Sequence, residues 1–293
     1  MAFAFKLTDK NTAKAVRRIV RSRLAASTAL ITDRSLPKAE LVHELRKNIK
    51  KSRAALRLVR PGFKAFGREN DALRDAGRLM EPLRDADVLS QTFDRIADKL
   101  HLPQTSQARL REALAAPQEQ APDTEAAFAA HAEAIAAITA RSKGWKAHGS
   151  GFDALAGGLE RSWDDARGAL EKAAASPTPE RLHRWRRRVK DHWYHARLLA
   201  PVWPEMMHPH VVTADTLGEM LGDARDLAAL IEALAGVEGG DEVCAQAARE
   251  EARLRTDAFA LGTRFFREPA HGLSRRWRGW WEIWTDRSGQ SSE

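Results

Sequence analysis

A basic helical segment that occurs twice places the strongest constraint on the fold of this chain. Residues 41–61 read LVHELRKNIKKSRAALRLVRP, residues 181–201 read RLHRWRRRVKDHWYHARLLAP, and the two align without a gap. A histidine, several basic residues, the apolar positions and the terminal proline coincide, which scattered charge matches alone do not explain. At a constant offset of 140 positions the pairs include His43 with His183, Lys50 with Lys190, and Pro61 with Pro201.

A second pair of similar segments follows the two basic segments. MEPLRDADVL (80–89) aligns with LGDARDLAAL (221–230) at an offset of 141, so that the Arg-Asp dipeptides at 84–85 and 225–226 coincide. We therefore expect an internal duplication with a unit of about 140 residues, which is too long for a solenoid repeat and suits a small helical domain.

The remaining sequence predicts helices and no strands. Alanine, leucine, arginine and glutamate favour helix, and valine-rich alternating runs are missing. Proline and glycine fall mostly between the periodic segments, and the stretch KAHGSG (146–151) lies at the middle of the chain. We expect an all-α fold divided at this stretch into two domains, 1–146 and 147–293.

Composition limits the class of protein. Hydrophobic residues make up 43% and charged residues 30% of the chain, as in a globular protein. Cys244 is the single cysteine, which excludes a disulfide framework and a cysteine metal cluster and suits a reducing cytoplasm. Cys244 itself is expected to be a small buried residue. The N-terminus lacks the apolar run of a signal peptide, and no segment approaches the roughly 20 apolar residues of a membrane span.

Positive charge is concentrated in the two repeated segments. Each contains seven Lys or Arg and one acidic residue, a local charge of +6, whereas the whole chain carries +8. The rest of the chain therefore sums to −4, so the protein is predicted to have two basic helices on a mildly acidic body.

The first basic helix has two separate faces. At about 100° per residue, five basic side chains share an arc of roughly 80°, and five apolar side chains share another arc about 120° away. The basic stripe is His43, Arg46, Lys50, Arg53 and Arg57, and the apolar stripe is Leu41, Leu45, Ile49, Leu56 and Val59. The apolar stripe should pack against neighbouring helices, and the basic stripe, about 21 Å long, should face elsewhere.

A row of cations suits an extended polyanion better than a small anion, because the polyanion offsets the repulsion along the row and releases its own counterions. Other cations share faces that could extend the row: Lys14, Arg17 and Arg21 on the first helix, and Arg68, Arg74 and Arg78 on the third. A solvated surface is the alternative interpretation for each of them.

These motifs resemble the CHAD family, the conserved histidine α-helical domain. VHELRKNIKKSRAALRLV and LHRWRRRVKDHWYHARLL have the pattern of the first family motif, and LRDADVL that of the second, with GDARDLAAL a looser match. The resemblance extends roughly from Lys14 to Trp284. It implies two antiparallel helical bundles related by a pseudo-two-fold axis, with a basic groove or pore between them. It also implies binding of inorganic polyphosphate and association with polyphosphate granules in the bacterial cytoplasm.

The resemblance and the basic faces together define the candidate polyphosphate-binding residues. In the second copy, Asp191 and Trp193 stand where the family has basic residues. This departure puts tight polyphosphate binding by the second copy in doubt. The candidates are Arg17, Arg21, His43, Arg46, Lys47, Lys50, Lys51, Arg53, Arg57, Arg74, Arg78, His183, Arg186, Arg187, Lys190 and Arg197.

Two other classes of function stay open. A nucleic-acid binder would use the same cations and would need base contacts or stacking, for which the second basic helix offers Trp185, Trp193 and Tyr194. Core packing is the alternative interpretation for these aromatics. A metal or catalytic site is the other class, but the flanking His192 and His195 occur in one copy only. No catalytic motif is found, so neither an enzyme nor a cofactor is predicted.

The two repeated histidines are expected to donate hydrogen bonds to the ligand and not to bind metal. Surrounding cations should keep His43 and His183 neutral until a polyanion arrives. Binding should then take up protons near the unperturbed histidine pKa of about 6.5 and tighten as the pH falls from about 8 toward 6.

Overall fold

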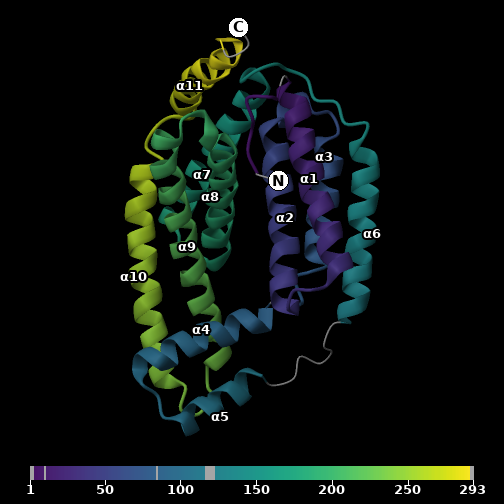
Figure 1. Ribbon diagram of the computed structural model, residues 1–293. Coiled ribbons are helices and arrows are strands. Elements are labelled where there is room, and N and C mark those ends of the chain that lie inside the picture. Colours follow the sequence, from purple (N-terminus) through teal and green to yellow (C-terminus); the bar gives the residue numbers. More distant parts are fainter. Residues whose placement is uncertain (1–2, 10, 84, 116–122, 291–293) are drawn as a thin grey trace.

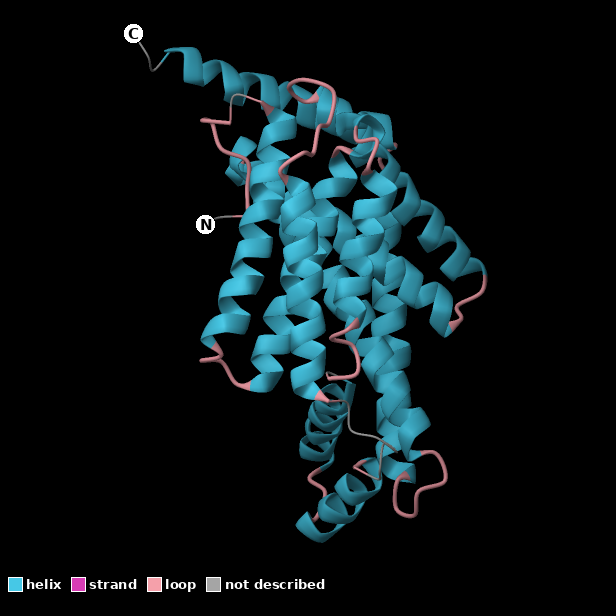
Figure 2. Cartoon of the chain, turned by 90° about the vertical axis from the view of Figure 1, so that its right-hand side faces the viewer, coloured by secondary structure: helices cyan, strands magenta, loops and turns pink. Residues whose placement is uncertain are grey.

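The fold is entirely helical in the described part of the chain, as the sequence predicted. The computed structural model describes residues 3–9, 11–83, 85–115 and 123–290, and in these ranges there are eleven α-helices, two short 3-10 helices and no strand (Figure 2). The helices are α1 (Thr12–Asp33), α2 (Lys38–Leu58), η1 (Arg60–Gly62), α3 (Phe66–Arg78), α4 (Asp85–Leu100), α5 (Gln104–Leu114), α6 (Thr124–Ser142), α7 (Asp153–Ala175), α8 (Pro179–Leu199), η2 (Ala200–Val202), α9 (Pro204–Leu234), α10 (Asp241–Phe265) and α11 (Ala270–Gln290).

The same order of elements surrounds each basic helix. A long helix, α1 or α7, precedes the basic helix, α2 or α8, and each basic helix passes into a one-turn 3-10 helix that contains a proline. The 3-10 helices η1 and η2 begin 140 residues apart, which is the offset of the two basic segments. The duplication itself stays an inference from the sequence.

Local sequence signals explain where the basic helices begin and end. The α8 helix has Pro179 in its first turn, and the side chain of its N-cap Thr178 accepts a hydrogen bond from the amide of Arg181. Proline suits this position because its fixed φ is helical and its missing N–H would have no partner there. Pro61 and Pro201, four residues after Arg57 and Arg197, lie where each α-helix has already given way to a 3-10 turn.

One hydrophobic core joins the two halves of the chain. Its buried residues come from α1 and α2 in the first half and from α7, α8 and α11 in the second, and its largest side chains include Trp163, Trp185 and Trp277. All five residues of the predicted apolar stripe are buried, at 3% exposure or less, which confirms that stripe. Because burial of apolar surface is the main stabilising contribution to folding, this shared core ties α2 and α8 to each other.

A second apolar cluster mixes the halves again. Phe93 and Ile96 of α4 and Leu110 of α5 pack with Leu227 of α9 and Val243 of α10. In Figure 1, α4 accordingly crosses one end of the molecule, from the group of α1, α2, α3 and α6 toward α9 and α10. The division into domains 1–146 and 147–293 stays a prediction.

The loop at the middle of the chain contacts the end of α2. It connects α6 to α7 and includes Gly149 and Gly151, both with positive φ, where glycine avoids strain. The amide of His148 donates a hydrogen bond to the carbonyl of Gly62 at 2.9 Å. A Cβ at Gly62 would lie 2.5 Å from the carbonyl oxygen of His148, so only glycine fits at this contact.

Three further features concern individual side chains and the membrane question. Trp277 and Trp281 of α11 are buried, which agrees with a packing role for the tryptophan-rich C-terminal helix. Cys244 is half-buried, whereas the sequence predicted a buried residue, because one side of α10 remains open to solvent there. Among the helices of the described ranges, none has an apolar stretch long enough to cross a bilayer.

Candidate functional site

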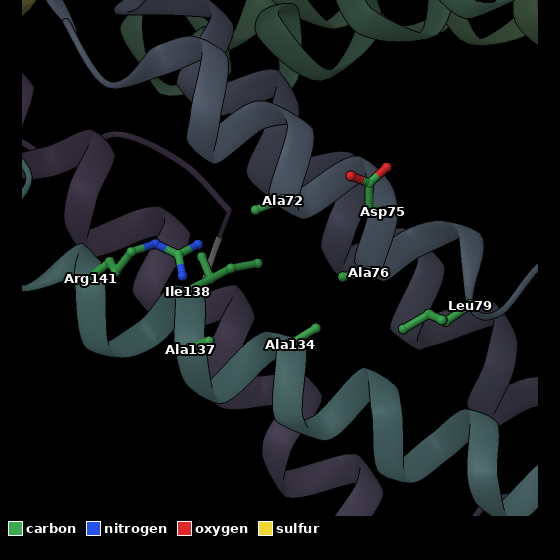
Figure 3. Close-up of a pocket in the computed structure, with 8 residues that line it drawn as sticks. All are labelled: Ala72, Asp75, Ala76, Leu79, Ala134, Ala137, Ile138 and Arg141. Atoms are coloured by element: carbon green, nitrogen blue, oxygen red, sulfur yellow. The ribbon is translucent and has the colours of Figure 1, made fainter.

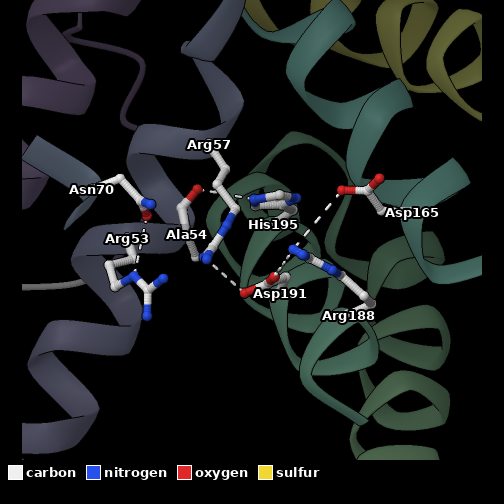
Figure 4. Close-up of polar contacts among 8 residues, drawn as sticks. All are labelled: Arg53, Ala54, Arg57, Asn70, Asp165, Arg188, Asp191 and His195. Atoms are coloured by element: carbon white, nitrogen blue, oxygen red, sulfur yellow. Dashed lines mark hydrogen bonds and ion pairs between the residues drawn. The ribbon is translucent and has the colours of Figure 1, made fainter. Parts of the chain in front are cut away.

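The two basic helices lie against each other, and their contact, which we call the basic junction, is the centre of the candidate site. Arg57 of α2 donates a hydrogen bond to Asp191 of α8 at 2.8 Å, and Nε2 of His195 donates one to the carbonyl of Ala54 at 2.9 Å (Figure 4). Both contacts are largely buried, with 11% of the Arg57 side chain and 15% of the Asp191 side chain exposed. At these two contacts the helices are therefore packed directly against each other.

On one side of the junction, the Asp191 side, arginines surround a single carboxylate. Besides Arg57, the guanidinium of Arg188 lies 3.2 Å from Asp191, and Arg188 also lies 3.8 Å from Asp165 of α7 (Figure 4). Burial, with Arg57 as the next cause, lowers the pKa of Arg53 to about 10, and Asp191 opposes this shift. The carboxylate thus stabilises charges that would otherwise repel one another.

On the other side, the Lys51 side, the central residue is itself a cation. Lys51 of α2 is 8% exposed, and its ammonium lies 5.7 Å from the ring centre of Phe3. Burial first, and then the charges of Lys47, Arg197 and Arg23, lower the pKa of Lys51 to about 8, while Glu44 opposes the shift. The Lys51 side gathers cations from α1, α2 and α8 around a position where a positive charge is disfavoured.

The remaining residues of the basic stripe differ in exposure. His43 and Lys50 are exposed, whereas Arg46 is mostly buried and lies 3.7 Å from Glu81. Nε of Arg53 donates a hydrogen bond to the side-chain oxygen of Asn70 at 3.1 Å (Figure 4). The predicted stripe is thus solvent-facing near its N-terminal end and passes into the junction at Arg57.

The cations of α8 lie across α9, where two glycines make room for them. A Cβ at Gly218 would lie 2.8 Å from the side chain of Lys190, and a Cβ at Gly222 would lie 2.9 Å from that of Arg186. Lys190 pairs with Asp215 at 2.8 Å and also with Glu219. These two carboxylates, four residues apart on one face of α9, partly neutralise the second copy of the motif.

The aromatic residues of α8 are engaged within the protein. Trp185 is fully buried and stacks on Phe259, and Tyr194 is buried as well. The half-buried Trp193 has the ammonium of Lys190 at 4.4 Å and the guanidinium of Arg197 at 4.7 Å from its ring centre. Core packing is therefore the role of the first two, and cation–π contact that of the third.

The buried histidines have partners inside the fold. His192 lies with its Nε2 2.7 Å from Nε2 of His210, and His195 is bound to Ala54 as described above. Burial lowers the pKa of His195 to about 4 and that of His210 to about 3. In the ranges that the structure describes, no group of three or more His, Cys, Asp or Glu is placed to hold a metal ion.

His183, one of the two repeated histidines, lies among cations. Burial first, and then the charges of Arg225, Arg187 and Arg186, lower its pKa to about 4. Its Nδ1 is buried without a hydrogen-bond partner among the described residues. This agrees with the prediction that His183 is neutral before a ligand arrives. Arg187 also has a lowered pKa, caused first by burial and opposed by Asp191.

Several predicted residues lie away from the junction. Arg17 donates to the carbonyls of Lys143 and Trp145, both at 3.3 Å, beyond the end of α6, and so stabilises that end of the helix. Arg21 is half-buried on α1. Of the two α3 candidates, Arg74 pairs with Asp71 at 2.8 Å and with Asp75 at 3.0 Å, and Arg78 lies 3.6 Å from Asp75.

The downstream motif can be described in the second copy only. Arg84 and the side chain of Asp85 lie outside the described residues, whereas Arg225 is exposed on α9. Sequence reasoning missed Arg23, because it lies off the helix face that carries Arg17 and Arg21. It also missed the ion pairs of Asp215 and Glu219, although their four-residue spacing was readable.

A shallow hollow of about 300 Å³ between α3 and α6 is separate from the junction (Figure 3). It is lined by Ala72, Asp75, Ala76, Leu79, Ala134, Ala137, Ile138 and Arg141. Arg141, at its edge, pairs with the buried Glu69 at 3.0 Å and so joins the two helices. The hollow presents mainly small apolar side chains and no converging set of polar groups.

Comparisons with known proteins agree with the motif analysis. The family model of the CHAD domain matches residues 14–235, from the first turn of α1 to the residue after α9. The match contains both basic helices and stops short of α10 and α11, whereas the resemblance was expected to reach about Trp284. No curated protein matched the chain. Since the matched range covers most of the sequence, the chain belongs to the CHAD domain family.

Proposed function

We propose that this protein binds inorganic polyphosphate, without turnover, through the basic stripe of α2 and the basic junction. The observation that carries the proposal is the Lys51 side of the junction. There, burial and the neighbouring cations Lys47, Arg197 and Arg23 disfavour the charged form of Lys51. An anion placed among these groups would attract the cations and favour the charged form of Lys51. This attraction would contribute favourable free energy to binding.

The shape of the basic surface favours a linear ligand. The stripe from His43 to Arg57 extends for about 21 Å along α2, and its exposed members His43 and Lys50 lie on the same face as the arginines that enter the junction. A chain of linked phosphates can contact such a row at successive positions. Each contact releases counterions, which makes the affinity fall steeply with salt.

His183 adds a neutral hydrogen-bond donor to the cations. Its lowered pKa keeps the ring uncharged at neutral pH, and its buried Nδ1 has no partner among the described residues. A neutral imidazole can donate one hydrogen bond to a phosphate oxygen. We propose this role for His183 and, at the aligned position, for His43.

Nucleic acid is the rival ligand, and the aromatic residues of α8 argue against it. Binding of single strands generally uses exposed aromatic rings on which bases stack. Trp185 and Tyr194 are buried, and Trp193 is in contact with Lys190 and Arg197. Polyphosphate has no bases and needs only the cations.

A salt titration of binding to long-chain polyphosphate tests the proposal. Lys50 is the best position for charge reversal because it is exposed on the stripe, whereas a glutamate at Arg46 would lie beside Glu81. Lys50→Glu should weaken binding and reduce its salt dependence, while Lys172→Glu, an exposed position on α7, should bind like the wild type. Equal loss in both variants, or no binding by the wild type, would refute the proposal.

Two further measurements separate the rivals. Duplex DNA should compete poorly against polyphosphate, and effective competition would support the nucleic-acid alternative. Incubation of polyphosphate with protein and Mg²⁺ should release no phosphate in proportion to the protein. Release that Lys50→Glu abolishes would identify an enzyme instead.

The proposed location can be tested in a bacterial cell that stores polyphosphate. A fluorescent fusion should collect on the granules, and diffuse signal would count against that location.

A further inference from the structure

The two sides of the basic junction occupy aligned positions but carry opposite central charges. At the offset of 140 that relates the basic segments, Asp191 aligns with Lys51, and Arg57 aligns with Arg197. Arg57 and Asp191 form an ion pair at 2.8 Å. Their counterparts, Arg197 and Lys51, are two cations, and Arg197 disfavours the charged form of Lys51.

Asp191 occupies the position that a bound anion would take among arginines. Its two carboxylate oxygens accept from Arg57 and from Arg188, at 2.8 and 3.2 Å, and its charge also acts on Arg53 and Arg187. Carboxylate and phosphate both accept paired hydrogen bonds from the planar fork of a guanidinium group. A phosphate could enter the Asp191 side only by displacing a carboxylate that is already bound there.

On the Lys51 side, a cation takes the aligned position of Asp191, and no described carboxylate pairs with it. Glu44, whose charge favours the charged form of Lys51, is on the same helix turn as Lys47 and pairs with it at 2.6 Å. The Lys47 side chain is 35% exposed, so an anion can reach the cluster past it, with Lys51 at the base. Arg23 and Arg197 bring charge from the two neighbouring helices.

Acidic residues replace cations at other aligned positions of the second copy as well. At the offset of 141 that relates the downstream segments, Asp215 aligns with Arg74, and Glu219 aligns with Arg78. Both carboxylates contact Lys190, the second-copy counterpart of Lys50. The positive charge of the second copy is thus partly neutralised by three acidic residues of that copy, Asp191, Asp215 and Glu219.

We propose that Lys47, Lys51, Arg23 and Arg197 form the principal phosphate subsite, and that Asp191 is a built-in counter-anion that closes the equivalent subsite on the other side. The inference rests on the proposed function and specifies how polyphosphate is held. The chain engages the ligand asymmetrically, along the first copy and the Lys51 side, and Asp191 limits the number of phosphates in contact.

The test compares the salt dependence of polyphosphate binding in matched variants. Removing one phosphate contact lowers the slope of log K against log salt by roughly 0.7 to 0.9. Lys51→Gln should show this decrease and bind roughly tenfold more weakly, as expected for loss of a charged hydrogen bond. Lys172→Gln, which removes the same charge from an exposed site on α7, should match the wild type.

Neutralising Asp191 should have the opposite effect. Asp191→Asn should bind more tightly, with a slope steeper by roughly 0.7 to 0.9, because its arginines become available to one more phosphate. Asp191→Glu retains the carboxylate and should keep the wild-type slope. Asp191→Ser serves as a second neutral variant if Asp191→Asn does not fold, and circular dichroism checks each protein.

The outcomes separate the inference from the proposed function. A wild type that shows no salt-dependent binding refutes the proposed function. A wild type that binds, together with Lys51→Gln and neutral Asp191 variants whose slopes equal that of Lys172→Gln, overturns the inference alone. If single-stranded DNA shows the same slope changes as polyphosphate, the subsite recognises phosphate in general and the proposed restriction to polyphosphate is wrong.

Discussion

Nε2 of His195 donates a hydrogen bond to the carbonyl oxygen of Ala54 at 2.9 Å, so a buried side chain of α8 is bound to the backbone of α2. Neither residue belongs to the repeated motif positions that suggested a function. The bond holds the two basic helices together at the point where their charges would drive them apart.

Removal of this bond should loosen the junction. We expect His195→Ala to lower the free energy of unfolding by roughly 1 to 3 kcal/mol, through the lost hydrogen bond and the lost packing of a fully buried ring. Urea denaturation measures the change. His208→Ala, at an exposed position of α9, should alter stability by less than about 0.5 kcal/mol. Equal effects would show that the bond contributes nothing specific.

Acid should destabilise the fold through the buried histidines. The folded-state pKa is about 4 for His195 and about 3 for His210, and that of His192 is well below its usual value because the ring is buried. The unfolded chain takes up these protons near pH 6.5 and the folded chain does not. Stability is therefore complete above pH 6.5 and falls toward pH 4, by about 1.4 kcal/mol per pH unit for each histidine.

Urea titrations at pH 7 and pH 5 measure this loss. The variant His192→Phe with His210→Leu replaces a neutral polar pair by apolar side chains and should reduce the slope with pH. A slope unchanged in the double variant would mean that other groups cause the acid sensitivity.

The charge of Lys51 should lower the stability of the free protein, although it favours binding of the polyanion. Its folded-state pKa of about 8 lies below the unfolded value, so the unfolded chain binds the extra proton between about pH 8 and pH 10.5. The sign is the reverse of a stabilising ion pair: stability rises as the pH increases through this window. Lys51→Met should be more stable than the wild type at pH 7, and the difference should shrink toward pH 10. Thermal unfolding at both pH values checks this, and a less stable variant at pH 7 would contradict it.

Close packing of α7 on the end of α2 should make Gly158 intolerant of a side chain. A Cβ there would collide with the carbonyl oxygens of Arg57 and Leu58. Gly158→Ala should therefore destabilise the protein by roughly 2 kcal/mol or more, through backbone displacement. Gly168→Ala, on the same helix with nothing within 4 Å, should instead stabilise it by up to about 1 kcal/mol. Chemical denaturation of the two variants distinguishes a steric cause from helix propensity, because propensity alone would stabilise both.

Binding should couple to protonation of His183 at a lower pH than the sequence suggested. The free-state pKa of about 4 replaces the unperturbed value on which the expected range of pH 8 to 6 rested. Bound phosphates raise this pKa, so the complex takes up a proton and binding tightens as the pH falls from about 6.5 toward 4. Calorimetry in buffers of different ionisation enthalpy measures the uptake. His183→Gln should remove it over the range where both proteins are folded, and persistence of the uptake would assign it to another group.

The elements of the fold could be predicted from the sequence because they depend on local patterns. The 3.6-residue period identified the buried side of α2, from Leu41 to Val59, and proline and glycine marked the helix ends. The family motif placed His183 among cations, which its lowered pKa bears out.

Contacts between distant helices could not be predicted in the same way. Asp191 was recognised as a departure from the motif, but its pairing with Arg57 depends on how α8 crosses α2. Lys51 was named as a candidate ligand-binding cation from the motif, and the motif did not show that the approach of α1 and α8 buries it. Arg17 shares a face with basic neighbours on α1, and only the position of α6 shows that it stabilises a helix end.

The crossing of α4 over one end of the molecule has a mechanical consequence. Two helical segments that each carry a charge of +6 repel each other. Through Phe93 and Ile96, α4 of the first half of the chain packs on α9 and α10, and α9 in turn packs on the basic helix α8. This packing adds to the shared core that joins α2 and α8, so a polyanion would meet basic surfaces that are already held close together.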